Sequence, residues 1–346
     1  MRRMISSKKI ALSYLLPFIV AVVGFAQPGQ AQNPEHLIKL ATLAPDGSSW
    51  LAAVRTIDTQ VRAQTDGAVG FKVYPGGVQG DEDVMLRKMR IGQLHAGGFG
   101  GQGTSHAFAD ILALEMPFLF QNYDEVDYVL AQMDGFFSAG YQANGYVLLG
   151  WSDIGFVHLL SKAPVQGVSD IQKRKVWRLE GEPITQVLFG KAGVTSVPLA
   201  IPDVLLGLQT NLVDVVYASP VAAIVLQWFT RVKYVTELPI NYSLGAFLID
   251  KRVFDKLDPA HQTILHDTAR KVMRQQMEQS RKDNLEAIEV MRANGLEFVA
   301  PDPDELATFK QLVRESTPEL VGNAFSTQAY EQIQQHLATF RANDQP

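Results

Sequence analysis

The segment HLIKLATLAPDGSSWLAAVRTIDTQVRAQTDGAVGFKVY, residues 36–74, contains the strand–helix–strand pattern that decides the fold. Residues 36–43 are mainly apolar, as in a buried strand, and residues 69–74 have the same character. Between them, the turn Pro45-Asp46-Gly47-Ser48-Ser49 offers a serine as the N-cap of a helix that extends to about residue 64. This alternation of strand and helix predicts an α/β protein.

The same alternation continues along the chain. Further strands are expected at residues 94–97, 146–151, 156–161, 175–179, 195–198, 213–218 and 247–250. Helices are expected at 81–91, after Pro183, and at 202–210. Residues 259–294 are charged and free of Pro and Gly after Pro259, which predicts one long helix able to lie along two lobes. No flexible linker separates the lobes, so strands that cross between them must join them.

The first 31 residues have the pattern of a secretory signal. Four basic residues lie within the first nine, residues 10–26 are uncharged and mostly apolar, and Gly29-Gln30-Ala31 is a small-residue cleavage site after Ala31. The alternative is a membrane anchor, but 17 apolar residues are at the short edge of a bilayer span. Pro17 and the Gln-Pro-Gly-Gln segment favour cleavage. We therefore expect export to the periplasm, without the cysteine that a lipid anchor requires.

Charge and cysteine content limit the possible partners. Residues 1–31 carry four of the 31 basic side chains and none of the 36 acidic ones, which leaves 27 against 36 and a formal charge of −9. A net negative chain is not expected to bind nucleic acid or anionic lipid surfaces. The absence of cysteine means that the fold depends on an ordinary apolar core rather than on disulfides.

No sequence signature of catalysis is present. The chain has no G-x-S-x-G, H-E-x-x-H or Walker motif, and its seven histidines do not have the spacing of a zinc site. His95 is better explained as a core or cleft-edge residue than as a ligand. The glycine-rich run at residues 97–103 matches G-x-G-x-x-G at one offset, but without the expected context of a nucleotide site. A loop that lines a cleft explains it better. No cofactor and no metal are expected.

Aromatic residues near strand ends and helix starts provide the best candidate site, because α/β proteins bind ligands at strand ends. The other interpretation is that these residues belong to the core. Arg178 lies within the apolar strand 175–179, where it either pairs with Glu180 or faces a ligand carboxylate. The candidate ligand-binding residues are Pro45, Trp50, Phe99, Phe118, Trp151, Trp177, Arg178, Tyr217, Ser219 and Trp228.

Six motifs, in order along the chain, resemble those of the solute receptors of tripartite ATP-independent periplasmic (TRAP) transporters. They are ATLAPDGSSW (Ala41–Trp50), YPGGVQGDE (Tyr74–Glu82), LRKMRIGQLH (Leu86–His95), LEMPFLF (Leu114–Phe120), VPLAIPDV (Val197–Val204) and GLQTNLVD (Gly207–Asp214). The resemblance implies a two-lobed periplasmic binding protein fold, with a cleft between the lobes, crossing strands and a long C-terminal helix. It also implies that an organic acid is bound and delivered to membrane TRAP permease subunits.

The resemblance fails at the residues that hold the ligand in this family. The family pairs an arginine in a K-x-R-V strand with an asparagine soon after a V-D-G motif. Counting from Asp170, Trp177 falls at the arginine position, whereas counting back from Pro183 places Arg178 there. Ala218 occupies the asparagine position, beside Tyr217. A hydrophobic or aromatic organic acid is therefore the expected cargo, and a small dicarboxylate or hydroxy acid the alternative.

These departures, with the segments at 177–183, 216–220 and 226–230, resemble a branch of the family that works with a periplasmic tetratricopeptide-repeat protein. The expected divisions are a signal peptide at 1–31, a first lobe at 32–155 with part of 245–346, a second lobe at 156–244, and a helical part at 259–346 across both lobes. The alternatives to a receptor are a periplasmic enzyme, for which Glu180, Glu182 and Asp153 are the nominated acids, and a docking protein that uses the long helix.

Overall fold

The first lobe is built on an α/β sheet whose strand order in the computed structural model is β2-β1-β3-β9-β4. The structure describes residues 34–343, so the expected signal peptide lies outside the described residues. β1 (His36–Thr42) pairs in parallel with β2 (Val69–Tyr74) and β3 (Ala96–Phe99). α1 (Ser49–Gln64) and α2 (Glu82–Arg90) connect these strands, and Ser48 caps α1 by accepting a hydrogen bond from the Leu51 N–H, as its sequence predicts.

Two long strands carry the chain between the lobes. β4 (Tyr146–Ser161) pairs antiparallel with β9 (Asn241–Asp250) along most of its length. The sequence predicts two strands at 146–151 and 156–161, and this prediction is wrong because one strand spans both. Its register shifts between Asp153 and Gly155, and Gly155 adopts φ +108°, so the pairing with β9 continues through a segment that resembles a turn in sequence.

The second lobe continues the same sheet in the order β4-β7-β5-β6. β7 pairs antiparallel with β4 and in parallel with β5, and β5 pairs in parallel with β6. The strands of this lobe are β5 (Val176–Leu179), β6 (Ser196–Leu199), β7 (Val215–Ala218), β8 (Tyr234–Thr236) and β10 (Glu297–Val299). Its helices are α5 (Val168–Ile171), α6 (Pro183–Lys191), α7 (Val204–Gln209) and α8 (Pro220–Val225), with 3-10 turns η2 (Ile201–Asp203) and η3 (Trp228–Arg231).

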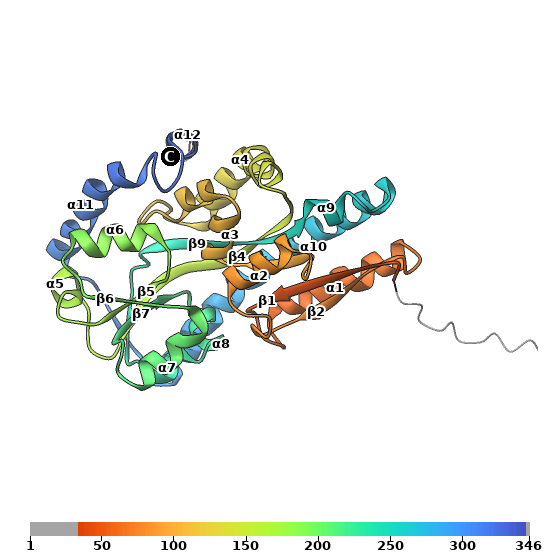
Figure 1. Ribbon diagram of the computed structural model, residues 1–346. Coiled ribbons are helices and arrows are strands. Elements are labelled where there is room, and N and C mark those ends of the chain that lie inside the picture. Colours follow the sequence, from red (N-terminus) through yellow and green to blue (C-terminus); the bar gives the residue numbers. More distant parts are fainter. Residues whose placement is uncertain (1–33, 344–346) are drawn as a thin grey trace, which may run out of the picture. The chain divides into compact units, whose positions relative to one another are not determined.

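The remaining helices cover the two lobes and their junction (Figure 1). α10 (Pro259–Ala293) confirms the predicted long helix, and it packs against α1, β4 and α8. Asn284 on α10 accepts a hydrogen bond from Val221 N–H of the second lobe and donates one to the Ile154 carbonyl of the crossing strand. The others are α3 (Gly101–Ala107), η1 (Ala109–Glu115), α4 (Tyr123–Ala143), α9 (Lys251–Phe254), α11 (Pro303–Leu320) and α12 (Thr327–Asn343).

A buried ion pair fixes α10 to the crossing strand. Arg281 Nε donates to Asp153 Oδ2 at 2.6 Å, and its two terminal nitrogens donate to Asp127 on α4. The guanidinium also lies 4.4 Å from the centre of the Tyr123 ring. The Asp153 side chain is fully buried, so this contact holds the strand in place beside its irregular step.

Candidate functional site

A cavity of about 170 Å³ lies where the two lobes meet. Most of its wall is apolar, and none of the described residues that line it is Lys, Arg or His. The first lobe and the crossing strands contribute Gly100, Gly101, Gln102, Glu115, Pro117, Ile154, Val157, Leu159, Ile240, Asn241 and Ser243. Phe309 of α11 also lines the cavity. The second lobe contributes Ile171, Trp177, Leu179, Glu182, Ile184, Thr185, Leu188, Phe189, Ile201, Tyr217, Ala218, Ser219, Ala222, Leu226 and Trp228.

Three aromatic rings form one wall of the cavity. Trp177 on β5 stacks on Tyr217 of β7 with ring centres 4.5 Å apart, and Trp228 meets Trp177 edge-on at 5.1 Å. The Trp177 indole N–H donates to the Leu199 carbonyl at 3.0 Å, and the Tyr217 hydroxyl accepts from Leu179 N–H. The polar groups of Trp177 and Tyr217 are therefore bonded to backbone, and the cavity wall that these rings form is apolar.

The register of β5 separates Trp177 from Arg178. Trp177 and Leu179 both line the cavity, and because side chains alternate along a strand, Arg178 points to the other face. The Arg178 guanidinium reaches the Leu179 carbonyl at 3.5 Å and lies near enough to Glu182 to lower the pKa of that carboxyl. Of the two residues that the sequence offers for the arginine position of the family clamp, Trp177 lines the cavity and Arg178 does not.

Two carboxyl groups reach the cavity from opposite lobes. Glu182 caps α6, and its oxygens accept from Ile184 N–H, Thr185 N–H and the Thr185 hydroxyl. Glu115, at the end of η1, accepts through Oε1 from the Ser243 hydroxyl at 3.0 Å and from Leu244 N–H at 3.2 Å. Burial raises the pKa of both groups, that of Glu115 to about 7.

A third buried acid lies behind the glycine-rich run. Glu82 accepts from Gly100 N–H and Gly103 N–H, at 2.6 Å each, and burial raises its pKa to about 7. A Cβ at Gly103 would meet Phe99 and the Glu82 carboxylate, and one at Gly98 would meet Trp50. These glycines therefore make room for buried side chains. Gly97 and Gly98 lie within β3, while Gly100 and Gly101 do line the cavity.

A hydrogen bond joins the lobes at the rim of the cavity. Gln102 Nε2 on α3 donates to the Glu180 carbonyl, which follows β5, at 2.7 Å. Gly181 lies beside the same contact, and a Cβ atom added there would lie 3.7 Å from the His106 ring. This contact joins α3 of the first lobe to the segment that follows β5 in the second lobe.

Four of the ten candidate residues line the cavity, namely Trp177, Tyr217, Ser219 and Trp228. Ser219 is fully buried and caps α8 through the Ala222 N–H. The structure places the other six away from the cavity wall. These are Pro45 in the loop after β1, Trp50 and Phe99 in the first-lobe core, Phe118 against Phe309, Trp151 against Phe137 and Tyr141, and Arg178 on the other face of β5.

The sequence interpretation missed Glu115, Gln102 and Thr185. Glu115 could have been noticed as the one acid inside the apolar segment at residues 111–120. Of the acids nominated for catalysis, Glu180 is exposed, Glu182 caps a helix and Asp153 pairs with Arg281 outside the cavity. Within residues 34–343, no group of three or more His, Asp or Glu is arranged to hold a metal ion.

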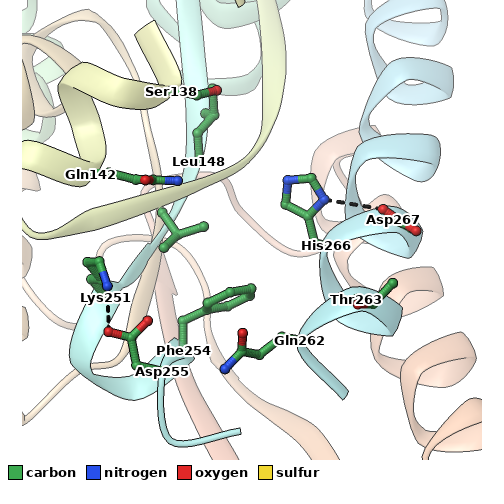
Figure 2. Close-up of a pocket in the computed structure, with 11 residues that line it drawn as sticks. Ser138, Gln142, Leu148, Lys251, Phe254, Asp255, Gln262, Thr263, His266 and Asp267 are labelled. Carbon is green, nitrogen blue, oxygen red and sulfur yellow. Dashed lines mark hydrogen bonds and ion pairs between the residues drawn. The ribbon is translucent and has the colours of Figure 1, made fainter. Parts of the chain in front are cut away.

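A second hollow, of about 340 Å³, lies on the outside of the first lobe between α4, α9 and α10. Its charged groups pair with each other, since Lys251 donates to Asp255 and His266 lies against Asp267 (Figure 2). It is open to solvent and lies away from the contact between the lobes. The cavity between the lobes is the better candidate site because both lobes contribute to it.

Comparison with known proteins identifies the family. Residues 40–323 match DctP, the bacterial extracellular solute-binding protein family 7. The chain belongs to this family. It is 23% identical over 257 residues to the 2,3-diketo-L-gulonate-binding periplasmic protein YiaO of Escherichia coli, which covers 71% of this chain and 76% of that protein. The family match confirms the resemblance to TRAP solute receptors that the sequence motifs indicate.

Solved TRAP receptor structures have the same fold. One from Xanthobacter autotrophicus, with bound β-D-galacturonate, superposes with a TM-score of 0.81 at 19% identity and covers 87% of this chain and 99% of that one. Another, from Citrobacter koseri with bound D-glucuronate, gives 0.77 at 25% identity over 89% and 99%. The predicted two-lobed α/β fold is confirmed. No helix within residues 34–343 is long and apolar enough to cross a bilayer.

Proposed function

We propose that this TRAP receptor captures an organic acid with an apolar or aromatic body in the cavity between its lobes and delivers it to the membrane permease. The observation that carries the proposal is the wall formed by Trp177, Tyr217 and Trp228, together with the lack of a cation among the described lining residues. Acid ligands of the related receptors, D-glucuronate and β-D-galacturonate, support the acid class.

The composition of the wall favours an apolar body over a sugar acid. A sugar acid needs hydrogen-bond partners for each hydroxyl, but Glu182 and Ser219 already cap helices. An aromatic ring buries about 150–250 Å². At about 25 cal/mol per Å², burial of that ring contributes about 4–6 kcal/mol without any ion pair. Closure of the lobes then excludes water from the bound ligand.

A thermal-shift panel tests this proposal. Mature protein is heated with 3-phenylpropionate, benzoate and octanoate, and separately with succinate, malate and D-glucuronate. Apolar acids are expected to raise Tm more than small or hydroxylated ones. Stabilisation by succinate, malate or D-glucuronate with no response to the apolar acids would show that this is a receptor of the ordinary small-acid or sugar-acid kind.

A pair of variants locates the binding site. Trp177→Leu keeps an apolar wall but removes the stacked ring, and is expected to weaken binding about 2–13-fold, because such aromatic pairs contribute about 0.5–1.5 kcal/mol beyond their area. Trp151→Phe is the control, since Trp151 packs against Phe137 and Tyr141 in the first-lobe core. Equal loss of affinity in both variants would refute the assignment of the site.

The partners are part of the proposal as well. We propose docking to the membrane permease and to a periplasmic tetratricopeptide-repeat protein, on the support of the departures at Trp177 and Ala218 from the family clamp. Export with cleavage near Ala31 is also proposed. Co-purification from membranes of cells that express the tagged full chain, followed by N-terminal sequencing, tests both points. A mature protein that starts at Met1 would refute cleavage, and the absence of any co-purified repeat protein would refute that partner.

A further inference from the structure

Glu115 is the acidic group in the cavity whose carboxyl is only half engaged. Its Oε1 accepts from the Ser243 hydroxyl and Leu244 N–H, whereas Oε2 receives no hydrogen bond from the residues at 34–343. Gly101 lies against the same carboxyl, and a Cβ there would come within 2.7 Å of Oε2. The carboxyl is therefore held in one position with one oxygen left for a ligand.

The ionisable groups around Glu115 are acids rather than cations. Glu182 on α6 and Glu82 on α2 both raise its pKa, in addition to the larger effect of burial. Tyr141 from α4 and Tyr217 from β7 are buried, and burial keeps them neutral by raising their pKa. The basic side chains of this region act on the neighbours of Glu115: Arg178 acts on Glu182 and Tyr217, and His106 acts on Glu82.

An ordinary carboxylate would meet a second negative charge in this place. Two like charges about 4 Å apart at an effective dielectric constant near 20 weaken binding on the order of a thousandfold. One proton placed between the two carboxyl groups removes the repulsion and forms a strong O–H···O⁻ hydrogen bond. A carboxyl pair that shares one proton is a known arrangement in proteins.

We propose that Glu115 binds the carboxyl of the ligand by sharing a single proton with it, so that the receptor takes up a proton with its cargo at neutral to alkaline pH. The inference rests on the proposed function, because it requires an organic acid as ligand. It makes Glu115 a specificity-determining residue for the carboxyl group, in a cavity whose described lining residues include no Lys, Arg or His. The ligand class is a monocarboxylic acid whose carboxylate accepts the hydrogen bond of the shared proton, with its apolar body against the aromatic wall.

The test is isothermal titration of the full mature protein with 3-phenylpropionate between pH 5.5 and 8.5. Kd is expected to rise about tenfold per pH unit above pH 7.5, and buffers of different ionisation enthalpy are expected to report uptake of about one proton per ligand at pH 8. Glu115→Gln is expected to remove the pH dependence and to retain binding at pH 8.5, because its amide donates to the carboxylate without a proton from solvent.

Two controls accompany it. Glu180→Gln changes an exposed acid at the rim and is expected to leave the pH dependence unchanged. The amide 3-phenylpropanamide carries no carboxylate and is expected to bind with the same Kd across the range. If 3-phenylpropionate binds with no proton uptake, or if Glu115→Gln keeps the pH dependence, the inference is overturned while the receptor function stands. If no apolar carboxylate binds between pH 5.5 and 8.5, both are overturned.

Discussion

Removing Arg281 is the sharpest test of how the crossing strand is held. Arg281 is the partner of Asp153, whose side chain is 0% exposed, and its other contact, Asp127, is 52% exposed. In Arg281→Met the aliphatic stem remains, but the buried Asp153 carboxylate loses its cationic partner. Breaking such a pair by removing one partner costs about 3–5 kcal/mol. We expect this loss in the free energy of unfolding, measured by urea denaturation at pH 7.5.

The pH dependence of this variant has a definite sign. Burial already raises the pKa of Asp153 and Arg281 opposes that effect, so loss of Arg281 raises the pKa further. A carboxyl group whose pKa is higher in the folded than in the unfolded protein stabilises the fold fully at pH values below the unfolded pKa. This stabilisation is lost as the pH rises through the folded pKa. The deficit of Arg281→Met is therefore expected to be smaller at pH 4.5 than at pH 7.5.

Two further variants separate the buried contact from the exposed one. Asp127→Asn removes only the exposed partner and is expected to cost less than about 1 kcal/mol. Adding Asp153→Asn to Arg281→Met removes the orphan charge and is expected to recover at least half of the loss. An Arg281→Met deficit no larger than that of Asp127→Asn, or a double variant as unstable as the single one, would refute this account of the crossing strand.

Three other predictions concern the cavity. Gly101→Ala places a methyl group against the Glu115 carboxyl and is expected to lower the free energy of unfolding by about 1–3 kcal/mol. Gly135→Ala is the control. Its added methyl group meets open space, so it is expected to raise the free energy of unfolding by up to about 1 kcal/mol. Gln102→Ala removes the bond to the Glu180 carbonyl, and calorimetry is expected to show about fivefold weaker ligand binding. The pKa of Glu115 in the folded protein, about 7, exceeds its ordinary value of 4.5. The free energy of unfolding is therefore expected to decrease as the pH rises from 4.5 to 7. Glu115→Gln is expected to make this decrease smaller, by at most about 3 kcal/mol in urea titrations.

These three predictions have clear contrary outcomes. Gly101→Ala as stable as the wild type would mean that the carboxyl moves at no cost. Unchanged affinity in Gln102→Ala would mean that the rim contact does not contribute to closure. A pH profile of stability identical in Glu115→Gln and the wild type would mean that the carboxyl is not desolvated.

Local signals in the sequence predicted most of the elements, and long-range pairing explains the main error. Ser48 is adjacent to the helix that it caps, and the apolar runs on either side of that helix are continuous in the sequence, so residues 36–74 could be interpreted alone. The step at Asp153 and Gly155 resembles a turn, and β4 passes through it only because β9, more than 80 residues later, supplies the pairing. Nothing local to residues 146–161 carries that information.

For the site, the sequence predicted the kind of residue, aromatic, better than it predicted which aromatic side chains face the cavity. Phe99 ends β3, Trp177 lies in β5 and Trp50 lies at the start of α1, but of these three only Trp177 lines the cavity. Proximity to a strand end specifies the edge of the sheet, whereas the direction of a side chain depends on register and on the helix that covers it. Glu115 was missed because an acid is recognised as a site residue only when its neighbours in space are known.

The positions of the polar and apolar groups explain why a ligand would close the receptor. Glu115, with its Ser243 and Leu244 partners, belongs to the first lobe and the crossing strand, whereas Trp177, Tyr217 and Trp228 all belong to the second lobe. A ligand with an acid at one end and an apolar body at the other contacts both groups only when the lobes are together. With the lobes apart it keeps at most one of these contacts, so its differential affinity for the closed state is the contact that closure adds, and a molecule able to make only one of them shifts the equilibrium less. On the proposed function, β5 supplies the apolar contact through Trp177, and the acid of the ligand meets Glu115 on the opposite lobe.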